Sequence, residues 1–263
     1  MSRQPDYRVD GGVALVTGAA GGIGAALAER LVREGSNIAL VDRNAEGLED
    51  LAGRLRVRRP DRQVTAIVAD LAQPEAPAEV VAQALAEHGR LTLLVNNAGV
   101  ALAGRFEQVS IADVDWLLAI NLRSVLAVTS AALPSLAPGA QITNISSLFG
   151  IVAPVGNSVY SASKFGVRGF SMALRTELAP RSIGVTTVYP GGIKTAIARH
   201  AQQPVHRGTA FGGVDGRAGE HLVAAAGQGL AELQLVGVGA VHLGGVEEGD
   251  AEIEGAVDHR RGL

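Results

Sequence analysis

The stretch "VALVTGAAGGIG", residues 13 to 24, runs from a short apolar segment into a turn with four glycines. The apolar segment is typical of a buried strand, and the pattern over residues 22–34 is typical of a helix. Glycine has no Cβ, so such a turn lets a diphosphate approach the backbone N–H groups where the helix begins. A plain tight turn would also use glycines, but the position between a first strand and a helix favours a dinucleotide site. The residues expected to contact the dinucleotide here are Gly18, Gly22, Ile23 and Gly24.

As far as about residue 200, the chain alternates short apolar runs with longer helical patterns. Strands this apolar are typical of a parallel sheet that is covered by helices on both faces. The sequence therefore predicts an α/β fold: a single doubly wound, Rossmann-type domain over residues 1–200, with a parallel sheet of six to seven strands flanked by helices. The predicted strands are 13–18, 37–42, 63–70, 91–97, 140–146 and 184–190, and the predicted helices are 22–34, 45–57, 75–88, 110–134 and 158–179.

Composition and charge exclude several classes of protein. The 263-residue chain is 47% hydrophobic and 19% charged, which is typical of a globular domain. Its net charge of -3 gives no general attraction for nucleic acid or an anionic membrane, so neither partner is expected. Cysteine is absent and the histidines are scattered, so no metal site is expected. We expect a cytoplasmic protein, because no uncharged apolar stretch is long enough for a signal segment or a membrane span.

Asp42 ends the second predicted strand and indicates which dinucleotide is preferred. A carboxylate at this place accepts hydrogen bonds from the adenosine ribose hydroxyls and repels a 2′-phosphate. The alternative is a helix N-cap close to Glu46. Arg43 would weaken the discrimination, but the glycine-rich turn carries no basic residue to hold a 2′-phosphate. We therefore expect NAD to be preferred over NADP.

The segment "VYSASKFG", residues 159 to 166, places Tyr160 four positions before Lys164. The chain has two lysines against 21 arginines, so an ammonium at this place calls for an explanation. Spacing of i, i+4 puts both side chains on one helix face, where the cation favours the phenolate and lowers the pKa of the phenol. A compact, rotatable ammonium does this where a planar guanidinium would not. The pair is therefore a candidate acid/base group, and the alternative is an ordinary helix pair.

A second interpretation of this segment is weaker. Ser161 to Lys164 also fit the Ser-x-x-Lys motif of penicillin-binding acyl transferases. That chemistry needs a Ser-Asp-Asn element and a Lys-Thr-Gly element, and the chain has neither.

Taken together, the motifs resemble those of the short-chain dehydrogenase/reductase family in its common form, over roughly residues 10–200. The family's Thr-Gly-x3-Gly-x-Gly motif stands at Thr17 to Gly24, and its Tyr-x3-Lys signature stands at Tyr160 and Lys164. The other matching positions are Asp70 with Leu71, the run Asn96, Asn97, Ala98 and Gly99, then Asn121, Ser147, Pro190 with Gly191, and Thr195.

The resemblance implies an NAD(P)-dependent oxidoreductase that transfers a hydride between the nicotinamide and an alcohol or ketone. It implies Tyr160 as general acid/base, Lys164 on the nicotinamide ribose, Ser147 on the substrate oxygen, and Asn121 holding a relay water. Strand alternation sends Ser146 and Ser147 to opposite sides, and the spacing in the family selects Ser147. It also implies a homodimer or homotetramer that pairs through helices 110–134 and 158–179. The further cofactor contacts that it implies are Asp70, Leu71, Asn97, Ala98, Gly99, Tyr160, Lys164, Pro190, Gly191, Ile193 and Thr195.

The residues expected near the substrate pocket are all uncharged, which favours a fairly apolar ketone or secondary alcohol. The alternative is that several of them are simply core. A rival to the enzyme is a non-catalytic or impaired dinucleotide-binding protein, but such a protein would be expected to lose Tyr160, Lys164 or Ser147. The pocket candidates are Val100, Leu102, Leu148, Phe149, Val155, Asn157 and Ile197.

Residues 201–263 differ in composition from the rest of the chain. From residue 212 onward there is no Ser, Thr, Asn, Lys, Pro, Tyr, Phe, Trp or Met, and 13 residues are glycine. Of the 52 residues from 160 to 211, 20 are of types whose codons all begin with A or T, whereas the next 52 include only Ile253. A GC-rich gene read out of frame would produce this skew. We therefore infer a frameshift near residues 200–212; the alternative is a genuine Gly-rich tail in which residues 234–245 form a seventh strand.

As the tail stands, we expect it to pack poorly and to leave the substrate side open, because each glycine raises the entropy cost of ordering.

Resequencing the gene tests the frameshift. We expect an inserted or deleted base between codons 200 and 212. In the corrected frame, Ser, Thr and Asn should return beyond residue 212. An uninterrupted frame without the expected base skew would show that the tail is genuine.

Overall fold

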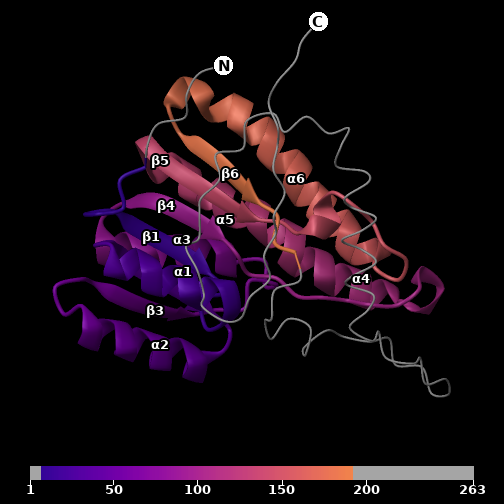
Figure 1. The fold of residues 1–263 in the computed structure, drawn as a ribbon, viewed down its shortest axis with the longest axis horizontal. Helices are drawn as coiled ribbons and strands as arrows, with labels where there is room; N and C mark the ends of the chain where they lie inside the picture. Colours follow the sequence, from indigo (N-terminus) through magenta and orange to yellow (C-terminus); the bar gives the residue numbers. More distant parts are fainter. Residues whose placement is uncertain (1–6, 192–263) are drawn as a thin grey trace, which may run out of the picture.

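A computed structural model gives the fold and describes residues 7–191 (Figure 1). Six strands form one parallel sheet in the order β3-β2-β1-β4-β5-β6, which confirms the predicted doubly wound α/β class. The expectations for the tail, including a seventh strand, fall outside the described residues. The strands are β1 (Val13–Thr17), β2 (Asn37–Asp42), β3 (Val64–Val68), β4 (Leu91–Asn96), β5 (Leu136–Ile145) and β6 (Gly184–Val188).

Helices connect the strands and begin at recognisable capping residues. The side chain of Asn44 accepts the backbone N–H of Gly47 at the start of α2, and that of Ser110 accepts the N–H of Asp113 at the start of α4. Such caps satisfy N–H groups that have no partner within the helix. The helices are α1 (Gly22–Arg33), α2 (Ala45–Arg58), α3 (Ala76–His88), α4 (Ile111–Leu118), α5 (Ser124–Ala132) and α6 (Ser158–Leu178).

The prediction of a single continuous α-helix over residues 110–134 is wrong, because the helix is interrupted. A π-helical turn, Ala119–Arg123, separates α4 from α5. The turn contains Asn121, whose side chain hydrogen-bonds to the backbone of Val100, and the hydroxyl of Ser124 donates to the Ile120 carbonyl. Wide turns of this kind occur mostly at functional sites, and hydrophobic periodicity does not reveal them.

The predicted strand at 140–146 also begins earlier, because Leu136 pairs with Leu91 before the register shifts.

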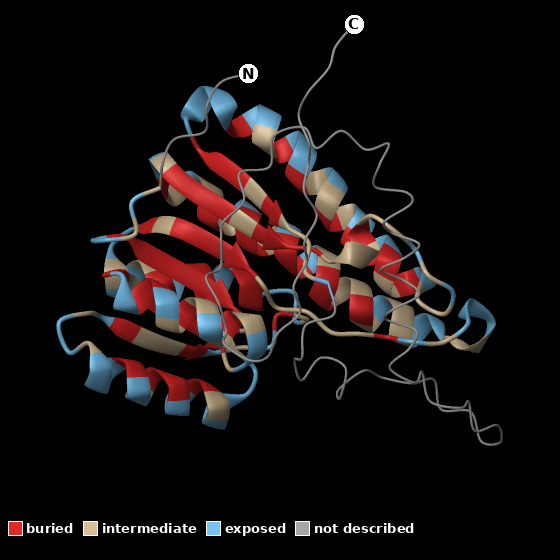
Figure 2. Cartoon of the chain, in the orientation of Figure 1, coloured by how far each residue is buried: buried red, intermediate tan, exposed pale blue. Residues whose placement is uncertain are grey.

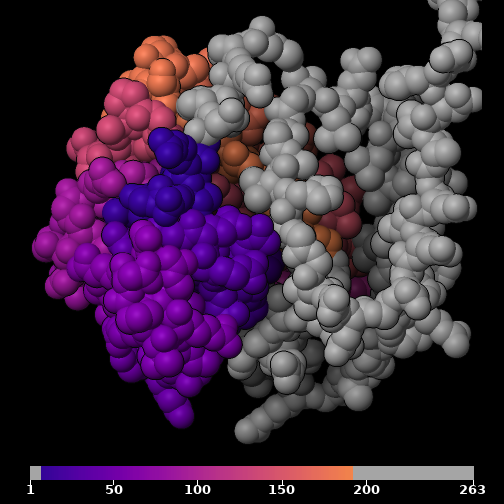
Figure 3. Space-filling view, turned by 60° about the vertical axis from the view of Figure 1, so that its left-hand side comes forward, coloured from indigo at the N-terminus to yellow at the C-terminus, as the bar shows by residue number. Residues whose placement is uncertain are grey.

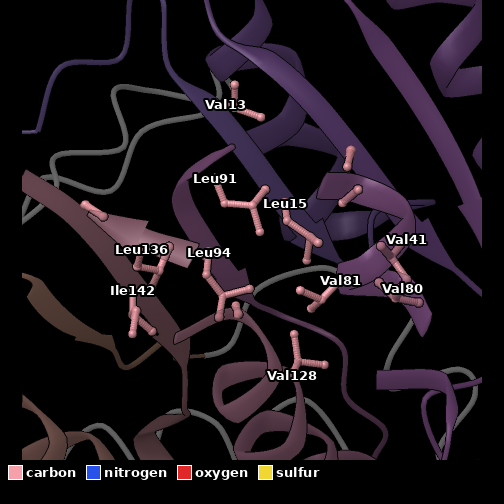
Figure 4. Close-up of a cluster of buried hydrophobic side chains, with 14 of the residues drawn as sticks. Val13, Leu15, Val41, Val80, Val81, Leu91, Leu94, Val128, Leu136 and Ile142 are labelled. Carbon is pink, nitrogen blue, oxygen red and sulfur yellow. The ribbon is translucent and has the colours of Figure 1, made fainter. Parts of the chain in front are cut away.

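Helices cover both faces of the sheet. Alternate residues of β1 show the division: Ala14 and Val16 pack toward α1 and α2, whereas Val13 and Leu15 pack toward α3, α5 and α6. Figure 2 shows the strands almost wholly buried, and Figure 4 shows the second of these two clusters. In the space-filling view of Figure 3, the first half of the domain, coloured indigo to purple, forms one continuous mass.

The segment Ile111–Ser135 is long and apolar enough to cross a membrane, judged by length and composition alone. Here it forms α4, the π turn and α5, and Val125, Val128 and Ala132 are buried in the domain. This is the pattern of a core helix, so the segment does not indicate a membrane protein.

The strand order places a crevice at one end of the sheet. The chain moves outward from β1 to β2 and β3, and then returns to pair β4 with the other side of β1. In open α/β sheets, ligands bind at the carboxyl ends of the strands where the order reverses in this way. The ends of β1 and β4, Thr17 and Asn96, mark that point.

Candidate active site

A cavity of about 550 Å³ lies at the carboxyl ends of the strands. The glycine-rich turn, the ends of β2, β4, β5 and β6, and the start of α6 contribute to its wall. Most of the cofactor-contacting residues expected from the sequence are brought together here. The lining residues are Gly18, Ala20, Gly21, Gly22, Ile23, Asp42, Arg43, Asn44, Asn97, Ala98, Gly99, Val100, Ala101, Ile145, Ser146, Ser147, Tyr160, Lys164, Pro190 and Gly191.

Two glycines of the turn occupy positions that no other residue fits. A Cβ at Gly24 would lie 2.1 Å from the carbonyl oxygen of Gly18. Gly18 has a φ of +65°, and a Cβ there would lie 2.8 Å from the Cα of Ala98. Helix α1 begins at Gly22 with no side-chain cap, so its first N–H groups have no side-chain partner. This cradle fits the diphosphate of a dinucleotide, which binds N–H groups at a helix start.

Thr17 and Asn97 hold the glycine-rich turn against the end of β4. The hydroxyl of Thr17 accepts the N–H groups of Asn97 and Ala98, both at 3.0 Å. The side-chain amide of Asn97 donates to the carbonyl oxygens of Thr17 and Gly18, at 2.9 and 3.0 Å. Asn97 is therefore a positioning residue for the turn as well as a lining residue of the cavity.

Asp42 uses both carboxylate oxygens to bind backbone N–H groups. One oxygen accepts from Ala20 in the glycine-rich turn at 3.0 Å, and the other accepts from Asn44 at 2.9 Å. The alternative interpretation of Asp42 as an N-cap is therefore wrong, because Asn44 caps α2. Asp42 joins the turn to the end of β2 and still lines the cavity beside Arg43.

A smaller cavity of about 100 Å³ continues from the first, with Gly18, Asp42 and Gly99 in both walls. Asp70 and Leu71 line it together with Val41 and Ile120. One carboxylate oxygen of Asp70 accepts the N–H of Ala72 at 3.0 Å. The structure thus places Asp70 and Leu71, two of the residues expected to contact the cofactor, in a separate lobe of the site.

Tyr160 and Ser147 lie together in the wall of the large cavity, where β5 ends and α6 begins. Burial raises the pKa of the Tyr160 phenol, and a hydrogen bond with the Ser147 side chain lowers it in part. The lowering expected from the Lys164 cation is therefore outweighed by burial. The hydroxyl oxygen of Ser147 also accepts the N–H of Phe149 at 3.1 Å, which leaves its own proton free to point elsewhere. The Phe149 ring packs edge-on against Tyr160, with centroids 6.0 Å apart.

Lys164 is buried beside Tyr160, with its ammonium 5.7 Å from the centre of the phenol ring. The ammonium donates to the carbonyl oxygen of Ile145 at 3.1 Å. Burial lowers the pKa of Lys164 to about 8. The group is therefore largely protonated at neutral pH but within reach of deprotonation.

Asn121 is fully buried, and the backbone of Val100 binds both ends of its amide. Its oxygen accepts the Val100 N–H at 2.8 Å, and its nitrogen donates to the Val100 carbonyl at 2.9 Å and to the hydroxyl of Ser163 at 3.3 Å. This is the geometry of a buried Asn that is held by nearby backbone. A Cβ on Gly99 would lie 3.4 Å from the Asn121 oxygen and 3.5 Å from the Lys164 nitrogen, so both atoms face the space that a side chain at position 99 would occupy.

Some of the remaining predicted residues line the cavity, some lie elsewhere in the fold, and some lie outside the described residues. Pro190 and Gly191 lie at the cavity after β6, whereas Ile193, Thr195 and Ile197 lie outside the described residues. Val100 lines the cavity, Leu102 is buried beside Leu117 and Val159, and Val155 is 89% exposed. The sequence indicated most of the lining but gave no signal for Ala20 or Ser163, whose partners Asp42 and Asn121 are distant in the chain. Asn44 was missed although Asn is a preferred N-cap residue.

Sequence comparison places these features in a known family. Residues 12–205 match the family described as short chain dehydrogenase. The match ends within the interval, residues 200–212, where the composition changes. A D-threitol dehydrogenase of Mycolicibacterium smegmatis is 43% identical over 199 residues, which are 74% of this chain and 75% of that protein. The 2,5-dichloro-2,5-cyclohexadiene-1,4-diol dehydrogenase LinX of Sphingobium indicum is 34% identical over 200 residues, 75% and 79% of the two chains.

Solved structures agree with this match. A short-chain dehydrogenase from Burkholderia cenocepacia in complex with NADP has a TM-score of 0.69 and 35% identity, covering 73% of this chain and 78% of that one. A short-chain dehydrogenase/reductase from Burkholderia phymatum in complex with NAD has a TM-score of 0.71 and 26% identity, covering 84% and 80%. The chain therefore belongs to the short-chain dehydrogenase/reductase family of oxidoreductases, with the Rossmann fold that binds NAD or NADP.

Proposed function

We propose that this protein interconverts an uncharged secondary alcohol and its ketone, with NAD as the preferred cofactor and Tyr160 as general acid/base. The observation that carries the proposal is the placement of Ser147, Tyr160 and the buried Lys164 ammonium in one cavity, which the glycine cradle also lines. A non-catalytic binding protein would have no need of these three side chains together.

Each side chain has a separate task. When bound, the nicotinamide supplies or accepts the hydride at carbon. The Ser147 hydroxyl donates to the substrate oxygen, and Tyr160 exchanges a proton with that same oxygen. The ammonium of Lys164 favours the phenolate form of Tyr160 and offers donors to ribose hydroxyls. Asn121 holds the backbone of Val100 in the cavity wall, and we propose that it also supports a relay water near Lys164.

Burial has opposite consequences for the two directions of the reaction. Because burial raises the pKa of Tyr160, the protonated phenol predominates at neutral pH and is ready to donate to a carbonyl oxygen. Alcohol oxidation needs the deprotonated phenol. Oxidation should therefore be favoured at higher pH than reduction.

The lining favours an uncharged substrate. Apart from Arg43 at the end of β2 and Lys164, which is assigned to the cofactor ribose, the residues that line the cavity supply no cation for a carboxylate or phosphate. We propose a fairly apolar alcohol or ketone. The name of the threitol dehydrogenase makes a small polyol the alternative, and that of the diol dehydrogenase LinX a cyclic diol. A panel of these alcohols separates the candidates.

The preference for NAD is proposed from Asp42, whose negative charge at the cavity wall repels a 2′-phosphate. Arg43 lies beside it and acts in the opposite sense. The protein is further proposed to be cytoplasmic and to bind neither nucleic acid nor membrane.

Assembly into a homodimer or homotetramer is proposed from the outer surfaces of α5 and α6. Leu126, Phe165 and Met172 on these helices are 39%, 40% and 57% exposed, although each is apolar. Pairing of two copies would remove this surface from water.

Replacement of Tyr160 by Phe tests the catalytic assignment. Tyr160→Phe should bind NAD as wild type does, yet lose roughly 10²–10⁴-fold in turnover, because only the acid/base proton is removed. Tyr7→Phe is the matched control, since Tyr7 is also a partly buried phenol that hydrogen-bonds a side chain, that of Thr92. The readout is the absorbance of NADH with secondary alcohols and ketones. Near-normal turnover in Tyr160→Phe would overturn the assignment.

Two substitutions at Asp42 separate charge from backbone support. Asp42→Asn removes the charge and keeps one of the two acceptor oxygens, so NADP should gain relative to NAD and the melting temperature should fall less than in Asp42→Ala. Asp42→Ala also removes both backbone contacts and should weaken NAD binding by about 1–3 kcal/mol. Titration calorimetry with both cofactors is the measurement. A wild type that already prefers NADP would show that Arg43 decides the preference.

Light scattering tests assembly. Wild type at micromolar concentration should have the mass of a dimer or tetramer, and Phe165→Glu should reduce it by placing a charge in the paired surface. Val57→Glu is the control, because Val57 is an exposed apolar residue on α2. A wild type with monomer mass would contradict the proposed pairing.

A further inference from the structure

A buried hydroxyl lies directly behind the catalytic groups and has no part in the chemistry proposed above. Ser146 follows the end of β5 and immediately precedes Ser147, with only 3% of its surface exposed. Successive side chains of an extended segment point to opposite sides, so Ser146 points away from Tyr160 when Ser147 points toward it.

Ser146 joins three parts of the fold. Its backbone N–H donates to the carbonyl of Val188 at the end of β6, at 2.8 Å. Its hydroxyl donates to the backbone carbonyl of Lys164 within α6, at 3.0 Å. The end of the sheet is thereby attached to the helix at the residue that carries the ammonium.

The junction has no spare room. A Cβ on Gly150 would lie 2.5 Å from the hydroxyl oxygen of Ser146 and 2.9 Å from the carbonyl oxygen of Lys164. Gly150 therefore packs directly against the contact between Ser146 and Lys164. The ammonium of Lys164 reaches the carbonyl of Ile145, so two successive residues, Ile145 and Ser146, hold the two ends of one lysine.

We propose that Ser146 is a positioning residue that fixes α6 at Lys164 relative to the end of β5 and so keeps Ser147 and Tyr160 in contact. The inference rests on the proposed function for its catalytic meaning. Ser147 stands on one side of the junction, whereas Tyr160 and Lys164 stand on the other. A small displacement of α6 would lengthen the Ser147–Tyr160 hydrogen bond, and misplacement of about 1 Å costs catalysis up to 10²-fold.

Ser171 provides a matched control on the same helix. It is fully buried, donates to the Val167 carbonyl at 2.7 Å and accepts the Asn144 side-chain amide at 2.9 Å. It lies two turns beyond Lys164. Ser171→Ala deletes a buried hydroxyl from the same packing layer and leaves Asn144 with an unpaired donor, so its structural cost should be no smaller than that of Ser146→Ala.

The test is the titration of the Tyr160 phenol, which needs no substrate. The chain has three tyrosines, so the ultraviolet difference between each protein and its Tyr160→Phe counterpart isolates the Tyr160 phenolate. Lys164 is the charged group nearest this phenol, and Asp42 and Arg43 lie at the end of β2, three strands from β5. In Ser146→Ala the midpoint should rise by about 0.5–1 unit, the equivalent of one neutral hydrogen bond. In Ser171→Ala it should stay at the wild-type value.

Ser146→Cys provides a second variant in case Ser146→Ala does not fold. A thiol fills the same place but is a weak donor, so its midpoint should lie between wild type and Ser146→Ala. Kinetics give the second readout: kcat for Ser146→Ala should fall about tenfold, the acid limb of the oxidation profile should move to higher pH, and NAD affinity should not change.

Equal midpoints in wild type, Ser146→Ala and Ser146→Cys would overturn the positioning role and leave Ser146 as a structural residue. Failure of the proposed function has a different signature, namely wild-type turnover that survives Tyr160→Phe. The two inferences therefore fail independently.

Discussion

The close approach of the first turn of α1 to the end of β1 sets the geometry of the whole site. At 2.1 Å between a hypothetical Gly24 Cβ and the Gly18 carbonyl oxygen, no side chain fits, so the backbone itself forms the floor of the cavity. Thr17 and Asn97 then fasten this turn to the end of β4 with four hydrogen bonds. The crevice where the strand order reverses is therefore held open by polar contacts rather than left as a gap between loops.

The sequence predicted the sheet and its helices because buried parallel strands and amphipathic helices leave strong periodic signals. The predicted helix 158–179 differs from α6 by one residue at its end, and all six strands were placed. The π turn at Asn121 was missed, since it preserves the apolar pattern of a helix while changing its backbone. The hydrogen bonds of Asp42 to Ala20 and of Asn121 to Val100 could not be predicted from the sequence either. They join segments about 20 residues apart, and no periodicity encodes such partners.

The structure gives a physical reason for lysine at position 164, the one lysine of the described residues. An isolated buried cation is costly, and here a single backbone carbonyl, that of Ile145, is its hydrogen-bond partner at the ammonium. Lysine relieves this cost because its pKa falls to about 8, so the proton can leave. Arginine would keep its charge at any working pH. The same burial raises the pKa of Tyr160, so the phenol keeps its proton at a pH where the Lys164 ammonium begins to lose one.

Both faces of the sheet are built on apolar clusters, but the face behind the catalytic groups also carries directional bonds. The apolar side chains of both clusters pack without strict direction. Behind the catalytic groups, by contrast, the Asn96 amide donates to Thr129 and Asn144, and the Asn144 amide donates to Ser171. These bonds tie β4 and β5 to α5 and α6, and each donor and acceptor pair fixes an angle as well as a distance. A dinucleotide cradle made of backbone tolerates small shifts of its supporting helices, whereas proton transfer between two side chains on different elements does not. Directional bonds are therefore concentrated where β5 and α6 must keep a fixed orientation.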